Sequence, residues 1–164
     1  MIGDRWGVTD DDVARRYPCD DHLTDPSWAA WRGVTVQAPP AAVWPWLVQV
    51  RLAPYSYDWI DNRGRRSPQE LRALPDPIPD EPFTASGGRP VGRVLAAERE
   101  AHVTVTIMGA VMSYVLVPAA PTGPTRLLMK LVGEHNRLVA PLLCVGDLVM
   151  ARRQLLNLKR LAER

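Results

Sequence analysis

The five residues from Tyr55 to Trp59 (Tyr-Ser-Tyr-Asp-Trp) form the densest group of polar and aromatic side chains in the sequence. A phenol and a carboxylate this close together could hold the polar group of a small ligand, with Tyr57 and Asp58 at the mouth of a pocket. A structural role is open as well, because aspartate commonly caps backbone turns and aromatic rings pack well where two elements meet. The structural role is the more common one for an aspartate at a turn.

Other reactive residue types do not combine into a catalytic or metal-binding pattern. His22, His102 and His135 are far apart in the chain, and none belongs to an HExxH motif. Cys19 and Cys144 do not form a CxxC pair, so we expect two packed, reduced thiols. The sequence contains no phosphate-binding loop, dinucleotide fingerprint or GxSxG motif. We therefore expect no metal, no cofactor and no residue with an evident catalytic role.

The segment from Pro90 to Gly133 is the element that would position a binding site. Apolar and polar residues alternate there with a period of two, which predicts strands at about 93–99, 102–108, 111–117 and 125–133. A two-residue loop at Gly109-Ala110 would place Ile107 opposite Met112. A longer loop over 118–124 would pair Leu116 with Leu127, Tyr114 with Met129 and Met112 with Leu131.

This register separates two faces of the predicted sheet. The face expected to point inward carries Val94, Ala96, Glu98, Val103, Val105, Ile107, Met112, Tyr114, Leu116, Leu127, Met129 and Leu131. The other face carries Arg99, His102, Thr104, Thr106, Ser113, Arg126 and Lys130. A shift of one residue would mix the two sets, so the separation favours this register. Tyr114 could orient a ligand or bond to backbone, and Glu98, at a strand end, is expected to be a solvated carboxylate at the rim.

The C-terminal segment predicts a long amphipathic helix that opens at Pro141. Its apolar stripe consists of Cys144, Leu148, Ala151, Leu155, Leu158 and Ala162, with spacings of three and four residues. Such a helix would lie on the apolar face of the sheet, and the small residues Cys144 and Ala151 would leave room for a ligand. We therefore predict a ligand site formed by Trp46, Tyr57, Asp58, Val105, Met112, Tyr114, Met129 and Leu148.

The N-terminal half predicts short elements broken by prolines. A strand at 31–37 is followed by Pro39-Pro40, where Pro40 suits the first position of a helix. Capping boxes at Thr9–Asp12 and Ser67–Glu70 predict two further short helices, the second ending at Leu74. The proline-rich run over 74–82 is expected to be a rigid loop.

The order of strand, Pro-Pro turn, Trp44-Pro-Trp-Leu-Val-Gln49, Tyr55-Ser-Tyr-Asp-Trp59, strand-rich middle and terminal helix resembles the START-like (SRPBCC) superfamily of Bet v 1-type folds. The resemblance covers Trp31 to Arg164. It implies an α+β helix-grip fold, in which a curved antiparallel sheet wraps around a long C-terminal helix and two short helices follow strand one. Residues 1–30 are expected to form a helix and an arm packed on this domain. The short link before residue 90 suggests that the strand usual there is lost or reduced.

Length, charge and apolar pattern limit the kinds of molecule that this protein is expected to bind. A chain of 164 residues suits one domain. The net charge of +2 and the absence of a long basic run argue against nucleic-acid binding. The longest apolar stretch, 138–151, is too short to span a membrane and contains a proline and an aspartate. With no signal-peptide pattern at the N-terminus, we expect a cytoplasmic protein.

Three functions stay open at this level. The apolar inward face favours binding of a small hydrophobic molecule, lipid-like or polycyclic, in an internal cavity. The resemblance also allows a polyketide cyclase or aromatase-like enzyme, although such chemistry needs a positioned acid or base. The third possibility is a collapsed cavity whose surface serves as an interaction module. Fold alone does not decide among them, and the scarcity of inward acids favours binding over catalysis.

Overall fold

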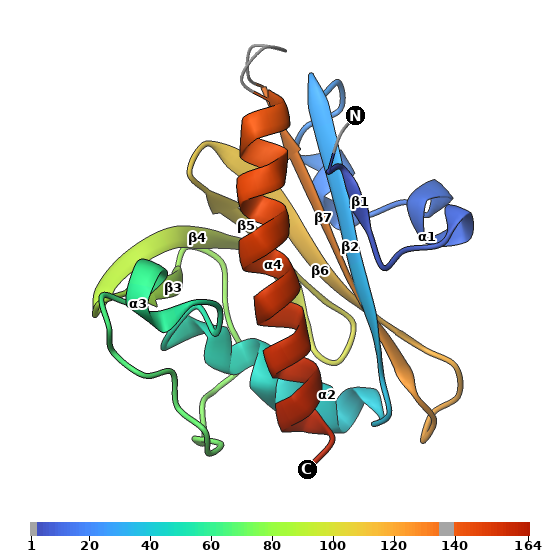
Figure 1. Ribbon diagram of the computed structural model, residues 1–164. Helices are drawn as coiled ribbons and strands as arrows, with labels where there is room; N and C mark the ends of the chain where they lie inside the picture. Colours follow the sequence, from blue (N-terminus) through green and yellow to red (C-terminus); the bar gives the residue numbers. More distant parts are fainter. Residues whose placement is uncertain (1–2, 135–139) are drawn as a thin grey trace.

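The computed structural model describes residues 3–134 and 140–164, and only the backbone of 140–143. A seven-stranded sheet with the order β1-β2-β7-β6-β5-β4-β3 curves around the C-terminal helix α4 (Figure 1). The strands are β1 (Arg5–Trp6), β2 (Trp28–Val36), β3 (Pro82–Ser86), β4 (Arg89–Glu98), β5 (His102–Ile107), β6 (Ala110–Pro118) and β7 (Thr125–Gly133). The helices are α1 (Asp10–Ala14), α2 (Pro40–Val48), α3 (Asp58–Asp61) and α4 (Ala140–Ala162), with 3-10 turns η1 (Pro18–Asp21) and η2 (Gln49–Arg51). The predicted α+β architecture, with two short helices after the first long strand, is confirmed.

The central hairpins follow the predicted faces. The expected β6–β7 pairs are confirmed, including Tyr114 with Met129. The β5–β6 loop is Met108-Gly109 instead of Gly109-Ala110, and both loop residues have a positive φ, as a tight hairpin turn of this length requires. Val105 consequently pairs with Met112, and Val103 with Tyr114. Each β5–β6 pair is shifted by two residues from the predicted pair. Because side chains alternate with a period of two, each side chain of these two strands keeps its predicted face of the sheet.

The predicted inward position of Glu98 is wrong, whereas the predicted exposure of its carboxylate to solvent is confirmed. The register between β4 and β5 shifts between Val94 and Ala96, so the chain gains one residue there. One extra residue reverses the side-chain alternation beyond the bulge. Glu98 therefore pairs with His102 on the outward face, and its side chain is exposed; Ala96 moves outward with it.

Two further local predictions also need correction. The strand expected to be lost or reduced is present as β3, a five-residue edge strand joined to β4 by Gly87-Gly88, both with positive φ. The predicted helix from Ser67 to Leu74 is absent, and the chain there is irregular. The reason is the buried side chain of Gln49, which donates to Glu70 O and accepts from Arg72 N, so it takes backbone groups that a helix would use. The second short helix is α3 instead.

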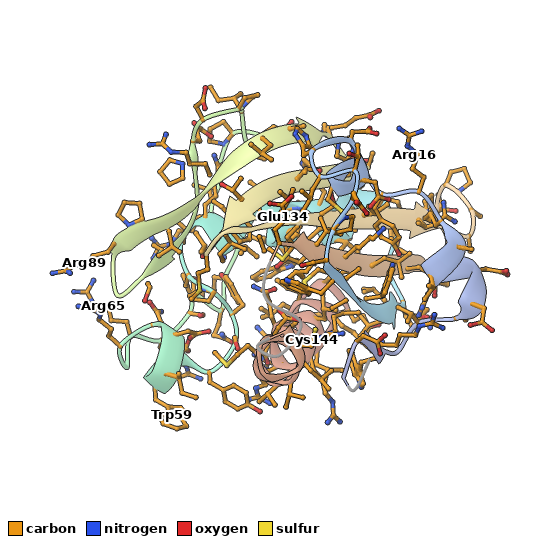
Figure 2. All side chains as sticks on the ribbon, turned by 90° about the horizontal axis from the view of Figure 1, so that it is seen from above. Arg16, Trp59, Arg65, Arg89, Glu134 and Cys144 are labelled. Carbon is orange, nitrogen blue, oxygen red and sulfur yellow. The ribbon has the colours of Figure 1, made fainter. Side chains whose placement is uncertain are left out.

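Helix α4 lies across the inward face of the sheet, and side chains fill the space between them (Figure 2). The predicted stripe is largely confirmed, since Cys144, Ala151, Leu155 and Leu158 are buried. Leu148 is only partly buried. Val105, Leu155 and Leu158 show no exposed surface at all, so this part of the core is closely packed.

The outward face of the sheet is covered by the N-terminal segment. Strand β1 pairs with β2 in parallel, a strand that the sequence did not predict and that makes the sheet mixed. Arg126 and Lys130 point away from α4, as predicted, and form ion pairs with Asp12 and Asp20 at 2.5 Å. The predicted capping box of Thr9 and Asp12 is confirmed at the start of α1. A second, smaller core forms beneath this segment from Tyr17, Cys19, Leu128 and Val132.

We predict that Gln49→Ala destabilises the protein by about 3 kcal/mol, because buried hydrogen-bonding groups lose their partner at once. The Gln49 amide donates to Tyr55 Oη at 2.6 Å and to Glu70 O at 2.9 Å, and accepts from Arg72 N at 2.7 Å. Urea unfolding would measure the change. Gln37→Ala, at an exposed position, is the matched control and should cost less than about 0.5 kcal/mol. Equal effects of the two substitutions would contradict this role of Gln49.

Candidate functional site

A fully buried arginine lies between the sheet and α4. Arg32 alternates with Ala30 and Val34 on the inward face of β2. Its guanidinium donates to Asp4 O at 2.8 Å, to Trp31 O at 2.9 Å and to Cys144 O at 3.0 Å. One cation thus joins the N-terminal segment, the sheet and the first turns of α4.

The counterion of Arg32 comes from α4. Asp147 Oδ2 lies 2.9 Å from Arg32 Nη2, and this oxygen is itself buried. Burial raises the pKa of Asp147 to about 6, although the Arg32 guanidinium opposes the shift. The side chain of Asp147 is 21% exposed, so the buried charges reach the molecular surface at this carboxylate.

A second polar pair lies farther along the same interface. Tyr114 Oη donates to Gln154 Oε1 at 2.5 Å, and Gln154 Nε2 donates to Pro54 O at 2.6 Å. Burial, and to a smaller extent the Asp147 carboxylate, raises the pKa of Tyr114. Asp147 and Gln154 are seven residues apart, which is about two helical turns, so both lie on the side of α4 that faces the sheet. We call Arg32, Tyr114, Asp147 and Gln154 the inner polar cluster.

The inner polar cluster combines groups that recognise a polar atom. It holds a permanent cation, a carboxyl with a raised pKa, a phenol and an amide within a core of aliphatic, aromatic and methionine side chains. The Arg32 Nε atom is buried and has no hydrogen-bond partner within the described part of the chain. A buried ion pair is a weak source of stability, because desolvation of both charges offsets their attraction. These groups are therefore a candidate site for a polar ligand atom, beside their structural contacts.

The structure brings together only part of the predicted ligand site. Val105 pairs with Met112 and Tyr114 with Met129, and all four side chains are buried on the inward face. Trp46 is also buried, on α2.

The other three predicted residues lie elsewhere. Tyr57, Asp58 and Leu148 line grooves on the outer surface beside α4.

The Tyr55–Trp59 segment has mainly structural contacts. Both oxygens of Asp58 accept hydrogen bonds from Ser67, at 2.6 Å from the hydroxyl and 2.8 Å from the backbone N–H. Ser56 Oγ donates to Met150 O, and Asn157 of α4 donates to Tyr55 O. These contacts match the structural role weighed for Asp58 and attach the segment to α4.

Arg32, Asp147 and Gln154 were not predicted as site residues, although the sequence contains a signal for Arg32 and for Asp147. Arg32 has the same parity as Val34 and Val36, so it had to share their inward face. Asp147 lies three residues after Cys144 and four before Ala151, within the apolar stripe of the helix. The inward face of the strand thus contains one cation and the apolar stripe of the helix contains one anion. Where these two faces pack together, this pattern predicts a buried ion pair.

Other candidate chemistries find no support in the described residues. His102 lies on the outward face, His22 follows η1, and His135 falls outside the described residues. No group of histidine, cysteine and acidic side chains that could hold a metal ion occurs in residues 3–134 and 140–164. Both cysteines are buried and outside disulfides, and burial raises the pKa of each thiol. Within the same residues, no helix has the length and apolar character needed to cross a membrane.

Solved structures resemble this fold at low sequence identity. Protein MLL2253 from Mesorhizobium loti has a TM-score of 0.54 and 20% identity, over 84% of this chain and 98% of that chain. A protein from Thermobifida fusca has a TM-score of 0.53 and 19% identity, over 81% and 94% of the two chains. EF2215 from Enterococcus faecalis, described as a conserved protein of unknown function, has a TM-score of 0.51 and 15% identity, over 88% and 81%. No family model matches the sequence, and no curated protein matches it significantly. At these sequence identities, the similarities show only that the fold is shared.

We predict that Arg32 and Asp147 are energetically coupled. Arg32→Met or Asp147→Leu alone leaves a buried charge without its partner, which typically costs about 3–5 kcal/mol. The double variant Arg32→Met/Asp147→Leu should be more stable than either single variant by about 2 kcal/mol, measured as the free energy of unfolding in urea. The same cycle on the partly exposed pair Arg51–Glu81 is the control, with an expected coupling below about 1 kcal/mol. Additive single effects at Arg32 and Asp147 would contradict the pairing.

We also predict a specific pH dependence of stability. The pKa of Asp147 rises from 3.8 in the unfolded chain to about 6 in the folded protein, so between these values the folded state holds the extra proton. Stability from this group is therefore present below pH 3.8 and lost as the pH rises to about 6, by roughly 3 kcal/mol in total. The difference in unfolding free energy between the wild type and the double variant, measured at pH 4, 5, 6 and 7, isolates this term. A difference that does not change with pH would show that Asp147 titrates normally.

Proposed function

We propose that this START-like protein binds a small, mainly apolar molecule between the curved sheet and α4, and that the inner polar cluster holds the polar group of that molecule. The observation that carries this proposal is the presence of four polar side chains in an interface whose other buried side chains are mainly aliphatic, aromatic and methionine. A ligand with one polar group and an apolar body would match both parts of this environment.

The chemistry of the surrounding side chains supports an apolar body. Met112 and Met129 lie on the inward face, with Leu116, Leu127 and Leu131 beside them. Methionine side chains are unbranched and repack at low cost, so they can yield volume to ligands of different shape. These side chains are buried, and a ligand would take their place beneath α4.

The inner polar cluster also has a path to the surface. The exposed part of Asp147 lies in the N-terminal half of α4, where Gly146 faces open space. A ligand entering there would meet the carboxyl of Asp147 first and Tyr114 deeper in the interface.

A second candidate function, a polyketide cyclase or aromatase-like enzyme, is favoured by one observation. Asp147, with a pKa raised to about 6, could exchange a proton near neutral pH, as a general acid or base must. The acids considered from the sequence do not fit this role, because Asp58 is bound by Ser67 and Glu98 faces outward. Turnover of a polyketide-like substrate that is abolished by Asp147→Asn and retained by Asp58→Asn would make this enzyme the better account.

Fluorescence titration with equilenin, a neutral polycyclic phenol, would test the binding function. We expect a micromolar dissociation constant, equivalent to about 8 kcal/mol. Tyr114→Phe should weaken binding by up to about 1.5 kcal/mol, because one neutral hydrogen bond is lost. Tyr17→Phe is the matched control, since Tyr17 is also a buried hydrogen-bond donor but lies on the opposite face of the sheet.

The outcomes separate the remaining functions. Binding that Tyr114→Phe does not change would place the probe outside the inner polar cluster. No binding of any neutral apolar probe, including in native mass spectrometry of protein purified from its own host, would favour a collapsed cavity that serves as an interaction module.

A further inference from the structure

A groove rich in arginine lies on the outer side of α4, away from the sheet. Its volume is about 360 Å³, and it is lined by α3, the loop after α3 and α4 (Figure 1), with Asp58, Arg66, Gln69, Arg153 and Arg160 among its residues. We call it the arginine groove. The sheet and the inner polar cluster lie on the other side of α4, so this groove is separate from the site proposed above.

The charges of the arginine groove are not balanced. Within the described residues, none of the three guanidiniums forms an ion pair: Arg160 donates to the Gln69 amide, Arg153 lies over the ring of Tyr57, and Arg66 has no hydrogen-bond or charged partner. The one lining carboxylate, Asp58, is held by Ser67. Three positive charges and one negative charge leave the groove with two positive charges.

An apolar groove adjoins the arginine groove. Its volume is about 370 Å³, and its apolar lining consists of Trp6, Leu148, Val149 and Leu156. Arg152 also lines it, with its guanidinium 5.5 Å from the centroid of the Trp6 ring. Tyr57 and Arg153 line both grooves, so the two are continuous along the outer side of α4. Val149 and Leu156 are among the few exposed large apolar side chains, at 49% and 37% exposure. These side chains give the apolar groove an exposed surface on which an apolar body could pack.

Several side chains of the arginine groove are held in place. Arg160 Nη2 lies 2.9 Å from Gln69 Oε1, and Arg164 Nη1 donates to Gln69 O at 3.0 Å. Arg153 lies 5.8 Å from the centroid of the Tyr57 ring. Fixed guanidiniums lose less conformational entropy on binding, and their planar donors match the oxygens of phosphate.

We propose that the two grooves together bind an amphiphile that carries a phosphate monoester at one end and an apolar body at the other. A phosphate monoester carries a charge of about −1.5 to −2 at neutral pH, which matches the two unbalanced positive charges. The phosphate contacts Arg66, Arg153 and Arg160, and the apolar body lies along Leu148, Val149 and Leu156 towards Trp6.

Isothermal titration calorimetry with hexyl phosphate, inorganic phosphate and hexanol tests this proposal. Hexyl phosphate should bind more tightly than inorganic phosphate, and hexanol should not bind detectably. The double variant Arg66→Gln/Arg153→Gln should weaken hexyl phosphate binding at least about tenfold, as expected for the loss of charge-assisted hydrogen bonds. Val149→Ser should reduce the advantage of hexyl phosphate over inorganic phosphate. Absence of hexyl phosphate binding, or equal binding by the arginine variant, would overturn the proposal.

Arg65→Gln is the matched control. Arg65 is adjacent to Arg66 in sequence, but its guanidinium lies against Gly88 in the β3–β4 turn and points outward near Arg89 (Figure 2). This variant should bind hexyl phosphate like the wild type. If Arg65→Gln weakened binding as much as the Arg66→Gln/Arg153→Gln variant, general surface charge would explain the binding and the proposed site would be wrong.

Two further measurements answer two questions. The first distinguishes a lipid headgroup from a free amphiphile as the ligand, and the second distinguishes the arginine groove from the inner polar cluster as its site. Co-sedimentation with phosphatidylcholine vesicles containing phosphatidic acid, lost in Arg66→Gln/Arg153→Gln, would identify a lipid headgroup as the ligand; hexyl phosphate binding without co-sedimentation would identify a free amphiphile. Both results support the phosphate site. The Arg32→Met/Asp147→Leu variant should bind hexyl phosphate normally, whereas a loss there would place the ligand in the inner polar cluster and overturn the proposal.

Discussion

The buried guanidinium of Arg32 is the interaction on which the arrangement of this protein depends. It binds backbone carbonyls of the N-terminal segment, of β2 and of α4, and it pairs with the carboxylate of Asp147. Because a buried cation needs every available acceptor, these elements have one favourable relative position. The apolar contacts beneath α4 supply most of the driving force, since they are numerous and non-directional. The hydrogen bonds and the ion pair of the guanidinium are directional, whereas the apolar contacts are not.

A second set of polar contacts fixes the side of α4 that faces the Pro54–Ser56 segment. Gln154 and Asn157 donate to carbonyls of this segment, and Ser56 donates back to Met150 O. Tyr55, in the middle, has a positive φ and is held through its hydroxyl by Gln49. The segment that looked most like a binding motif therefore attaches α4 to α2 and its following turn. Its remaining side chains, those of Tyr57, Asp58 and Trp59, line the outer grooves.

These two sets of contacts give α4 different surroundings on its two sides. The inner side meets an aliphatic face that contains few polar groups, where low polarity strengthens each remaining electrostatic interaction. The outer side carries arginines whose charges no carboxylate balances within the described residues. A ligand site on the inner side would select by shape and one polar contact, whereas a site on the outer side would select by charge. The two proposed sites therefore lie on opposite sides of the same helix.

The sequence by itself determined the alternation of the strands, the apolar stripe of α4, the capping box of α1, the start of α2 at Pro40 and the faces of Tyr114, Arg126 and Lys130. Each of these follows from a local period, a local hydrogen bond or the fixed φ of proline. It also contained the positions of Arg32 and Asp147 on facing apolar surfaces, although only their meeting in space makes them a pair. Tertiary structure decided the rest. The bulge before Ala96 turned Glu98 outward, Gln49 prevented a helix after Ser67, and Ser67 bound Asp58. These outcomes depend on residues distant in the sequence or on one inserted residue, and a local pattern carries no information about either.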